Sequence, residues 1–338
     1  MTELPSEAME FLDALSIEKN YSSNTILSYR RNLNQFFQWL EANNLPMDAG
    51  SLDTVTIRRY ITFFKGQVKN ISIKQKLATL KSFFKYLEEV FDGIRLPAIP
   101  RHMKKERMPI ETISLQEMFV ILEAVSKRIL ELSHTISARK RNVSRLQKQL
   151  DNCCRDLAIL ALLSGTGIRV GELTTINIDD ININDKTIII HGKRNKLREI
   201  FFDVPTIENP LLEYLNWRTS LNRDSQALFL NSKDLQRMTP RSVQRMLKLY
   251  LEIAGISQGV TPHILRHSYA SISIEKGANI KAISQLLGHS HVGTTLEYYT
   301  HLSKDHLRAV YRQSHPGSEV DKSLTEIMES RKSILTSL

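Results

Sequence analysis

The sequence predicts a mainly α-helical fold with a small antiparallel β-sheet, divided between a helical N-terminal domain and a larger mixed α/β domain. Three observations support this prediction. Apolar residues recur at helical spacing through the first ninety residues, which carry no strand signal. Two short β-prone runs flank the turn-like sequence KRNK at 193–196, as in a hairpin. A basic stretch with prolines separates the two patterns, and 338 residues are enough for two domains.

Helices are predicted over residues 5–18, 22–44, 52–66 and 72–91 of an N-terminal domain that spans residues 1–95. Residues 72–91 are the clearest, because apolar residues from Ile73 to Phe91 recur every three or four positions and form one stripe. The same periodicity puts four lysines on the other faces of this helix, namely Lys74, Lys76, Lys81 and Lys85.

Residues 96–112 are interpreted as a basic linker between the two domains. Residues 93–112 include three prolines, which interrupt helices, and the charged run RHMKKER. A solvated loop explains this composition as well as a linker that crosses a DNA backbone does. If the linker does cross DNA, its expected phosphate contacts are Arg101, Lys104 and Lys105, alongside Lys74 and Lys81 of the preceding helix.

The second domain is expected over residues 113–316, and it begins with a helix whose first residues, SLQE at 114–117, fit a capping box. Residues 127–150 carry seven Lys or Arg and a single acid, and so hold six of the ten net positive charges of the chain. Their apolar residues follow a heptad spacing, interrupted by Arg139, which predicts a long basic helix or a helical hairpin inserted into the domain. Contact with DNA, packing on a partner subunit and a solvated extension are equally open roles for this insertion.

The rest of the second domain is expected to be helical except at one hairpin. A buried helix covers residues 155–164 and ends at the GTG of 165–167, the hairpin lies within 186–204, and helices follow from residue 239. Residues 317–338 are predicted to form a loosely amphipathic C-terminal helix.

Charge and cysteine content limit the class of protein. Lys and Arg outnumber Asp and Glu by 46 to 36, which makes a polyanionic partner plausible. The adjacent Cys153 and Cys154 exclude a disulfide framework and a four-cysteine zinc site, and are interpreted as small core residues. The acidic N-terminus lacks the apolar run of a signal peptide, and no apolar stretch is long enough to span a membrane. A cytoplasmic protein with no membrane partner is therefore expected.

Four separated segments supply groups that suit phosphoryl transfer. The segments are SGTGIRVGELTTI, HGKRNKLRE, TPHILRHSYAS and LLGHSHVGTTLEYYTH, and their candidate groups are Arg169, Lys193, His263, Arg266, His267, His289, Tyr298 and Tyr299. Two guanidinium groups suit the charge that builds on a phosphorane, because each is a planar fork that keeps its proton. An attacking phenol needs a proton acceptor and the leaving oxygen needs a donor, roles open to histidine and lysine.

Each segment taken alone has a structural explanation. An arginine after Thr-Gly more often starts a helix than catalyses a reaction, a lysine in a KRNK turn is usually solvated, and His263 with Arg266 could be a structural pair. The order and spacing of all four segments together favour the catalytic interpretation.

The combined pattern resembles the tyrosine recombinase (phage integrase) family, including its Xer-type members. TGIRVGEL is similar to the family's first arginine box, GKRNKLR to its lysine hairpin, HILRHSYAS to its His-x-x-Arg-His box and LLGHS to its last box. SIKQKLATLKSFFKYL resembles the last helix of the family's core-binding domain, and YTHLSKDHLRAVYRQSHP resembles the end of Xer-type chains. The resemblance covers residues 1–126 and 151–316, so the insertion 127–150 is outside the ordinary pattern.

The resemblance implies a helical core-binding domain plus a mixed α/β tyrosine recombinase catalytic domain, closed around DNA as a clamp. It implies catalytic roles for Arg169, Lys193, His263, Arg266 and His289, with Glu172 and His267 in support. Cleavage by a tyrosine would leave a 3′-phosphotyrosyl link, with no metal, ATP or other cofactor.

The implied partners are double-stranded DNA at specific recombination sites and further copies of the chain, as a tetramer on two DNA sites. Residues 317–338 would dock on a neighbouring subunit, or alternatively fold onto their own domain. The job would be integration, excision or resolution of DNA, as for a mobile element or a chromosome.

Two adjacent tyrosines compete for the role of nucleophile. Tyr298 lies nine residues after His289, the Xer-type spacing, and Tyr299 lies ten residues after it, the spacing of many transposon-type integrases. Tyr299 is followed by Thr-His, which resembles the usual family sequence. Adjacent helical residues point about 100° apart, so only one of the two faces the phosphate. Tyr299 is preferred, with Tyr298 as the alternative.

Two other functions compete with recombination. A type IB topoisomerase relaxes DNA as a monomer with a similar site, but the Xer-like tail and the heptad segment argue for assembly. A non-catalytic DNA-binding protein would have no use for the full set of catalytic groups.

Overall fold

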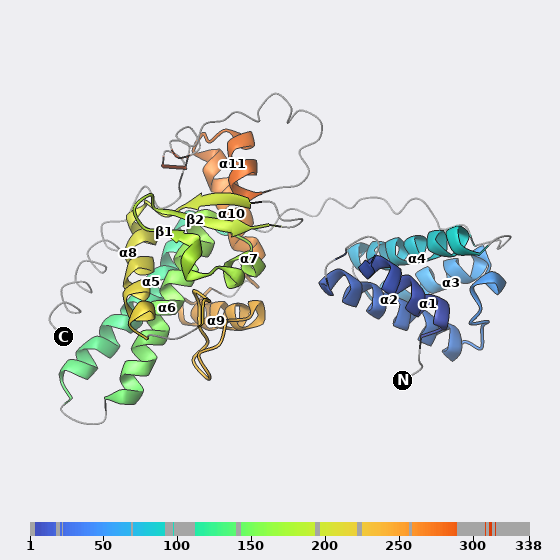
Figure 1. The fold of residues 1–338 in the computed structure, drawn as a ribbon, viewed down its shortest axis with the longest axis horizontal. Coiled ribbons are helices and arrows are strands. Elements are labelled where there is room, and N and C mark those ends of the chain that lie inside the picture. The colour runs from blue at the N-terminus through green and yellow to red at the C-terminus, as the bar shows by residue number, and fades with distance from the viewer. Residues whose placement is uncertain are drawn as a thin grey trace. The chain divides into compact units, whose positions relative to one another are not determined.

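A computed structural model describes residues 4–17, 21, 23–68, 70–91, 97, 112–139, 143–192, 197–221, 225–256, 259–288, 308, 311–312 and 315. The chain forms two compact units, Met1–Pro109 and Ile110–Leu338. The fold is mainly α-helical with one small antiparallel sheet, which confirms the predicted fold class (Figure 1).

The first unit contains the four predicted helices, with a 3₁₀ turn at Ala49–Ser51 between the second and third. They are α1 (Ser6–Ile17), α2 (Ser23–Ala42), α3 (Thr54–Phe64) and α4 (Asn70–Val90). The helix α3 starts where the Asp53 side chain accepts a hydrogen bond from the Thr56 amide at 2.7 Å. Aromatic side chains fill the core between the helices, and Phe36 packs edge-on against Tyr60 with ring centroids 5.0 Å apart.

One lysine of α4 departs from its predicted place. Lys76 was expected on an outer face, but it is buried, because its Nζ reaches the side-chain oxygen of Gln35 and lies 4.5 Å from the centre of the Phe64 ring. A lysine stem is apolar and can pack in a core when its ammonium finds a polar partner and an aromatic face. Of the lysines predicted to bind DNA, Lys81 is exposed and Lys74 is partly buried.

The second unit is built around one long helix, α6 (Ser144–Thr166), whose C-terminal part is buried. Its elements in chain order are α5 (Leu115–Ser137), α6 (Ser144–Thr166), α7 (Val170–Thr175), a 3₁₀ turn at Ile178–Asp180, β1 (Ile181–Asn182), β2 (Thr187–His191), β3 (Leu197–Phe201), α8 (Pro205–Ser220), α9 (Pro240–Ile253), α10 (Pro262–Glu275) and α11 (Ile280–Leu287). The central helix α6 packs against α5, α8 and α10. The predicted capping box of α5 is present, since Ser114 and Glu117 exchange side-chain-to-backbone hydrogen bonds of 3.2 and 2.8 Å.

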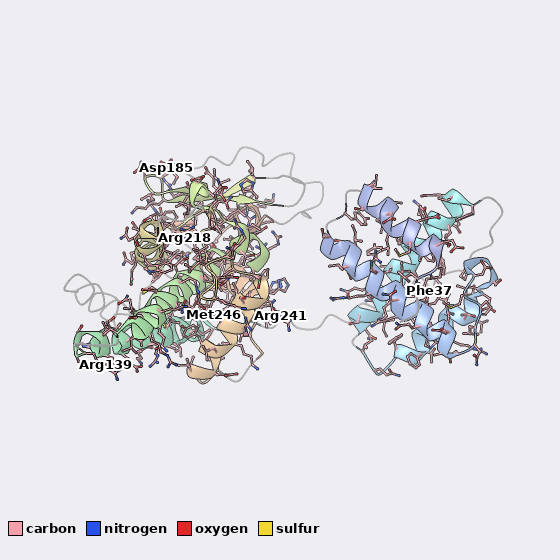
Figure 2. All side chains as sticks on the ribbon, turned by 60° about the horizontal axis from the view of Figure 1, so that its bottom comes forward. Phe37, Arg139, Asp185, Arg218, Arg241 and Met246 are labelled. Carbon is pink, nitrogen blue, oxygen red and sulfur yellow. The ribbon has the colours of Figure 1, made fainter. Side chains whose placement is uncertain are left out.

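The basic insertion 127–150 is a helical hairpin, formed by the end of α5 and the start of α6 (Figure 1). Its apolar heptad residues turn inward, and Ile129, Leu132 and Leu150 are buried in the core of the unit. Arg139, the exception in the heptad, is exposed at the tip (Figure 2). Residues 140–142 of the turn lie outside the described residues.

The predicted hairpin is present as β2 and β3, and β1 adds a short third strand that the sequence did not indicate. The strands pair antiparallel in the order β1-β2-β3, with Ile190 opposite Arg198 and His191 opposite Leu197. The turn 193–196 between β2 and β3 lies outside the described residues.

Parts of the C-terminal region contact this unit. Tyr311 and His315 are buried, and Arg312 pairs with Asp203 at 2.6 Å. Residues 317–338 lie outside the described residues. Cys153 and Cys154 are free and buried on α6, as predicted for core residues. None of the described helices has the length and apolar character needed to cross a membrane.

Candidate active site

The helix α10 carries three of the candidate residues, as the sequence predicted. The Thr261 side chain caps its first turn by accepting from the Ile264 amide at 3.3 Å, and Pro262 occupies the first helical position. His263, Arg266 and His267 follow at positions i, i+3 and i+4, so all three lie along one side of the helix.

Arg169 is placed by the turn between α6 and α7. Gly167 ends α6 with φ +61°, a left-handed conformation in which a Cβ atom would also lie 2.6 Å from side-chain atoms of Leu287 and Tyr269. Arg169 then precedes α7, with its amide 3.1 Å from the carboxylate of Glu172. The glycine therefore lets the chain turn tightly against α10 and α11 and aims Arg169 toward them.

Arg169 and Arg266 meet at the C-terminal end of α11. Nη2 of Arg266 donates to the Leu287 carbonyl oxygen at 2.7 Å, and Nη1 of Arg169 approaches the same oxygen at 3.4 Å. Nη2 of Arg169 also donates to the Gly288 carbonyl oxygen at 3.0 Å. The last carbonyls of a helix are unpaired and carry partial negative charge, so this end of α11 attracts and orients both guanidinium groups.

Glu172 is the acidic centre of this cluster. Its Oε1 accepts from Nη1 of Arg169 at 2.7 Å, and its two oxygens accept from Nη1 and Nη2 of Arg198 at 3.1 and 2.7 Å. Burial alone would raise the pKa of the Glu172 carboxyl, but the hydrogen bonds and charges of Arg198 and Arg169 outweigh it and lower the pKa below its usual value. Glu172 therefore stays ionised and holds two arginines in place.

Arg198 is the residue of this cluster that the sequence interpretation missed. It lies second in β3, its side chain is 13% exposed, and its Nε donates to the Leu286 carbonyl oxygen at 2.9 Å. A Cβ atom on Gly288 would come within 3.1 Å of the Arg198 side chain. The one available signal was a basic residue in the β-prone run directly after the KRNK turn.

His263 and His267 form a hydrogen-bonded pair on α10. Their Nε2 atoms are 2.9 Å apart and their rings meet nearly edge to face. One ring must donate this hydrogen bond and the other must accept it, so the accepting ring is neutral. Burial, followed by the nearby His263 and Arg266, lowers the pKa of His267 below its ordinary value. His267 is therefore neutral near pH 7 and able to accept a proton.

Arg266 is the most enclosed cation of the described site. It is 3% exposed, and Nη1 donates to the Gly167 carbonyl oxygen at 2.7 Å. Burial, together with the nearby Arg169 and Arg198, lowers the pKa of Arg266 to about 10. The guanidinium still holds its proton at pH 7, and its like-charged neighbours make an anion beside it favourable.

The cluster has unused donors that an anion can take. The contacts above occupy three of the five N–H groups of Arg169 and two of those of Arg266. The others have no acceptor within the described part of the chain. Carbonyl oxygens hold Arg266, and carbonyl oxygens together with Glu172 hold Arg169, which preorganises the two guanidinium groups for an oxyanion such as a phosphate.

Several predicted site residues fall outside the described residues, namely Lys193, His289, Tyr298, Tyr299, Arg101, Lys104 and Lys105. The described residues next to two of them belong to the cluster. Gly288, which precedes His289, accepts from Arg169, and β2 and β3 flank the turn that contains Lys193. His191, at the end of β2, is 3.1 Å from the Asp180 carboxylate.

Comparison with known proteins finds matches along most of the chain. Residues 137–306 match the phage integrase family, and residues 8–89 match the N-terminal SAM-like domain of phage integrases. The chain is 30% identical over 330 residues to the tyrosine recombinase XerC of Thermodesulfovibrio yellowstonii, an alignment that covers 95% of this chain and 100% of that protein.

Two solved structures share the fold. One is the XerH site-specific recombinase bound to difH substrate, with a TM-score of 0.61, 20% identity and coverage of 89% of this chain and 83% of that one. The other is a lambda integrase tetramer bound to a Holliday junction, with a TM-score of 0.60, 17% identity and coverage of 87% of this chain and 76% of that one.

Proposed function

The chain belongs to the phage integrase family and is a site-specific DNA recombinase of the tyrosine class, and from this premise we propose which of its residues cleave and rejoin the strands. The observation that carries the proposal is the convergence of Arg169 and Arg266 on the Leu287 carbonyl, two residues before His289. Two guanidinium groups from different elements are thereby held together with N–H groups to spare.

Arg169 and Arg266 bind the non-bridging oxygens of the scissile phosphate in this proposal, and His289 adds a third donor. Charge on those oxygens grows as the phosphorane forms. Donors already fixed in place stabilise that charge without reorganising, and in a dry site such donors contribute on the order of several kcal/mol. Glu172 contributes indirectly, because it orients Arg169.

Tyr299 is the proposed nucleophile. Its phenolic oxygen bonds to phosphorus while the bond from phosphorus to the 5′ oxygen breaks, which leaves a 3′-phosphotyrosyl link and a 5′-hydroxyl. The phenol proton passes to the His263–His267 pair, and Lys193 gives a proton to the departing 5′ oxygen. Attack by a 5′-hydroxyl on the phosphotyrosine reverses these steps and rejoins the strand, so the bond energy is conserved without ATP.

The nucleophile is tested by covalent trapping on a nicked suicide duplex that carries the cognate site. We expect wild type and Tyr298→Phe to form the protein–DNA adduct and Tyr299→Phe to form none. An adduct with Tyr299→Phe and none with Tyr298→Phe would transfer the role to Tyr298. The DNA that flanks the coding region is the first place to search for the site.

Double-stranded DNA is the partner of the enzyme, and we propose a tetramer on two DNA sites as its working form. The fold shared with a lambda integrase tetramer on a Holliday junction supports this proposal. Residues 317–338 are proposed to dock on a neighbouring subunit. Sedimentation with a two-site DNA should give four copies per complex, and a chain that ends at residue 316 should give fewer.

A further inference from the structure

Arg198 connects three parts of the second unit through three hydrogen bonds. Its Nη1 and Nη2 form a two-pronged contact with the Glu172 carboxylate, at 3.1 and 2.7 Å, and its Nε donates to the Leu286 carbonyl oxygen at 2.9 Å. Such paired contacts between guanidinium and carboxylate are among the strongest and most directional in proteins. Arg198 therefore fixes β3 against α7 and against the C-terminal end of α11.

The same residue lies at the base of a hairpin whose turn includes Lys193. Arg198 is opposite Ile190 in the β2–β3 ladder, and Leu197 opposite His191 is the last described pair before the turn. On the β2 side, His191 contacts Asp180 at 3.1 Å, but it is largely exposed and the weaker anchor. The hairpin also packs through the buried side chains of Ile188, Ile190 and Ile200. Arg198 adds a direct polar link from the base of the hairpin to Glu172, which in turn binds Arg169.

We propose that Arg198 is a positioning residue for strand cleavage, which holds the β2–β3 hairpin in the orientation from which Lys193 delivers a proton to the leaving oxygen. Arg198 is a positioning residue and not a catalytic one in this proposal, because its hydrogen bonds within the described residues go to Glu172 and Leu286. The inference rests on the proposed role of Lys193 as the proton donor.

A sulfur-substituted substrate separates this role from a purely structural one. In a 5′-bridging phosphorothiolate, the bond that breaks joins phosphorus to sulfur, and the electron pair leaves on a thiolate. An alkyl thiol has a pKa of about 8.5, far below that of an alcohol, so its departure needs no proton donor. A defect in proton delivery therefore disappears with this substrate, whereas a defect in phosphate binding or folding persists.

The test compares cleavage rates of Arg198→Ala, Lys193→Ala and wild type on the oxygen and sulfur substrates. With oxygen we expect Lys193→Ala to lose on the order of 10²- to 10⁴-fold, and Arg198→Ala to lose on the order of 10²-fold by misplacing the donor. With sulfur both should return close to the wild-type rate. The double variant should be no slower than Lys193→Ala alone, because both changes remove the same step.

Arg218→Ala is the matched control. Arg218 is also an enclosed arginine, 1% exposed, but its hydrogen bonds go to the carbonyls of Ala227 and Ser225, away from the hairpin. Any loss in this variant should be equal on the two substrates. Arg198→Lys keeps the charge without the two-pronged contact, so it should show the same oxygen-specific loss in a milder form. This variant replaces Arg198→Ala in the test if the alanine protein fails to fold.

Two different results would count against the proposed roles of Arg198 and Lys193. An Arg198→Ala or Arg198→Lys protein that unfolds cooperatively but is equally slow on both substrates would overturn the positioning role of Arg198 alone. A Lys193→Ala protein that sulfur does not rescue would instead remove Lys193 as the proton donor, and the inference about Arg198 with it.

Discussion

Glu172 shows how one carboxylate can organise a cationic site. Its side chain is 11% exposed and bonds to both Arg169 and Arg198. Without it, three arginines of like charge would meet near the end of α11 with no anion among them. The acid therefore makes the cluster stable before a phosphate arrives, and it does so without taking the donors that face away from it.

Replacement of Glu172 by Gln should destabilise the protein in a pH-dependent way. Three charge-assisted hydrogen bonds from Arg169 and Arg198 weaken, so we expect a loss on the order of 2 kcal/mol in the free energy of unfolding at pH 7. The pKa of Glu172 is lowered in the fold, so its contribution is complete above the unfolded value of about 4.3 and is lost as pH falls through the lower folded value. Urea unfolding of wild type and variant between pH 7 and pH 3 measures the difference.

The matched control is Glu252→Gln. Glu252 is exposed and lies 3.8 Å from Lys248 on α9, and pairs of this kind contribute roughly 0–1 kcal/mol. We expect little change at any pH. If the loss in Glu172→Gln stayed constant down to pH 3, the carboxylate would not be the source of the stability.

The pKa of His267 should depend on its neighbours on α10. We expect the His267 ring to take up its proton below pH 6.5, because burial, His263 and Arg266 all lower its pKa. His263→Gln removes one of these causes, so the pKa of His267 should move back toward 6.5. Ring-proton NMR across pH 5–8 measures the pKa of His267 in wild type and in the variant. A His267 that titrates above 6.5 in wild type would contradict the expected lowering of its pKa.

At the scale of elements, the α6–α7 turn limits what can replace Gly167. Alanine there would adopt a left-handed φ and would force a Cβ to within 2.6 Å of Leu287 and Tyr269. Strain and overpacking together should cost on the order of 3 kcal/mol. Gly171→Ala is the control, because nothing lies within 4 Å of its added Cβ and its φ is ordinary. It should be neutral or stabilising by up to about 1 kcal/mol. Thermal unfolding of wild type, Gly167→Ala and Gly171→Ala measures these differences in stability.

Local pattern predicted the elements better than their contacts. Periodicity identified the four helices of the first unit, the SLQE motif identified the capping box at Ser114, and two β-prone runs around a turn identified the β2–β3 hairpin. All three signals depend on residues near in sequence. It did not predict the burial of Lys76, which requires Gln35 and Phe64 from other helices. The short strand β1 was also missed, because two residues carry no period.

The candidate site divides in the same way. Arg169, Glu172, His263 and Arg266 were predicted as site residues from their motifs, each within a single segment. Arg198 was not, because its importance comes from Glu172 and Leu286, which are 26 and 88 residues away. Alternation along a strand predicts on which face of the sheet a side chain lies. It does not predict which helix end packs on that face.

At the scale of the whole molecule, the basic hairpin 127–150 has features that favour DNA over a protein partner. None of its described large apolar side chains is exposed, so it lacks the anchors of a protein interface. Its one acid, Glu131, is paired with Arg128 at 3.0 Å. Arg139, Arg145 and Lys148 are exposed and have no acidic partner within the described part of the chain.

Neutralising these three charges should therefore weaken DNA binding in a salt-dependent way. We expect the triple change to Gln at Arg139, Arg145 and Lys148 to reduce the slope of log affinity against log salt by about 0.9 for each phosphate that the variant no longer neutralises. The control exchanges Arg for Lys and Lys for Arg at the same positions, which keeps the charge. Equal slopes for the two variants on long DNA would identify the hairpin as a solvated extension.

The two cysteines offer a practical route to following assembly. Cys153 and Cys154 are the only thiols in the chain. Both are buried, and burial raises the pKa of the Cys153 thiol. Thiolates are the form that alkylating dyes attack, so a single cysteine introduced at an exposed position such as Ser144 should take the label selectively. Donor and acceptor fluorophores can thus be attached with the native thiols left in place. Energy transfer between labelled copies would then measure the rate at which they assemble on DNA.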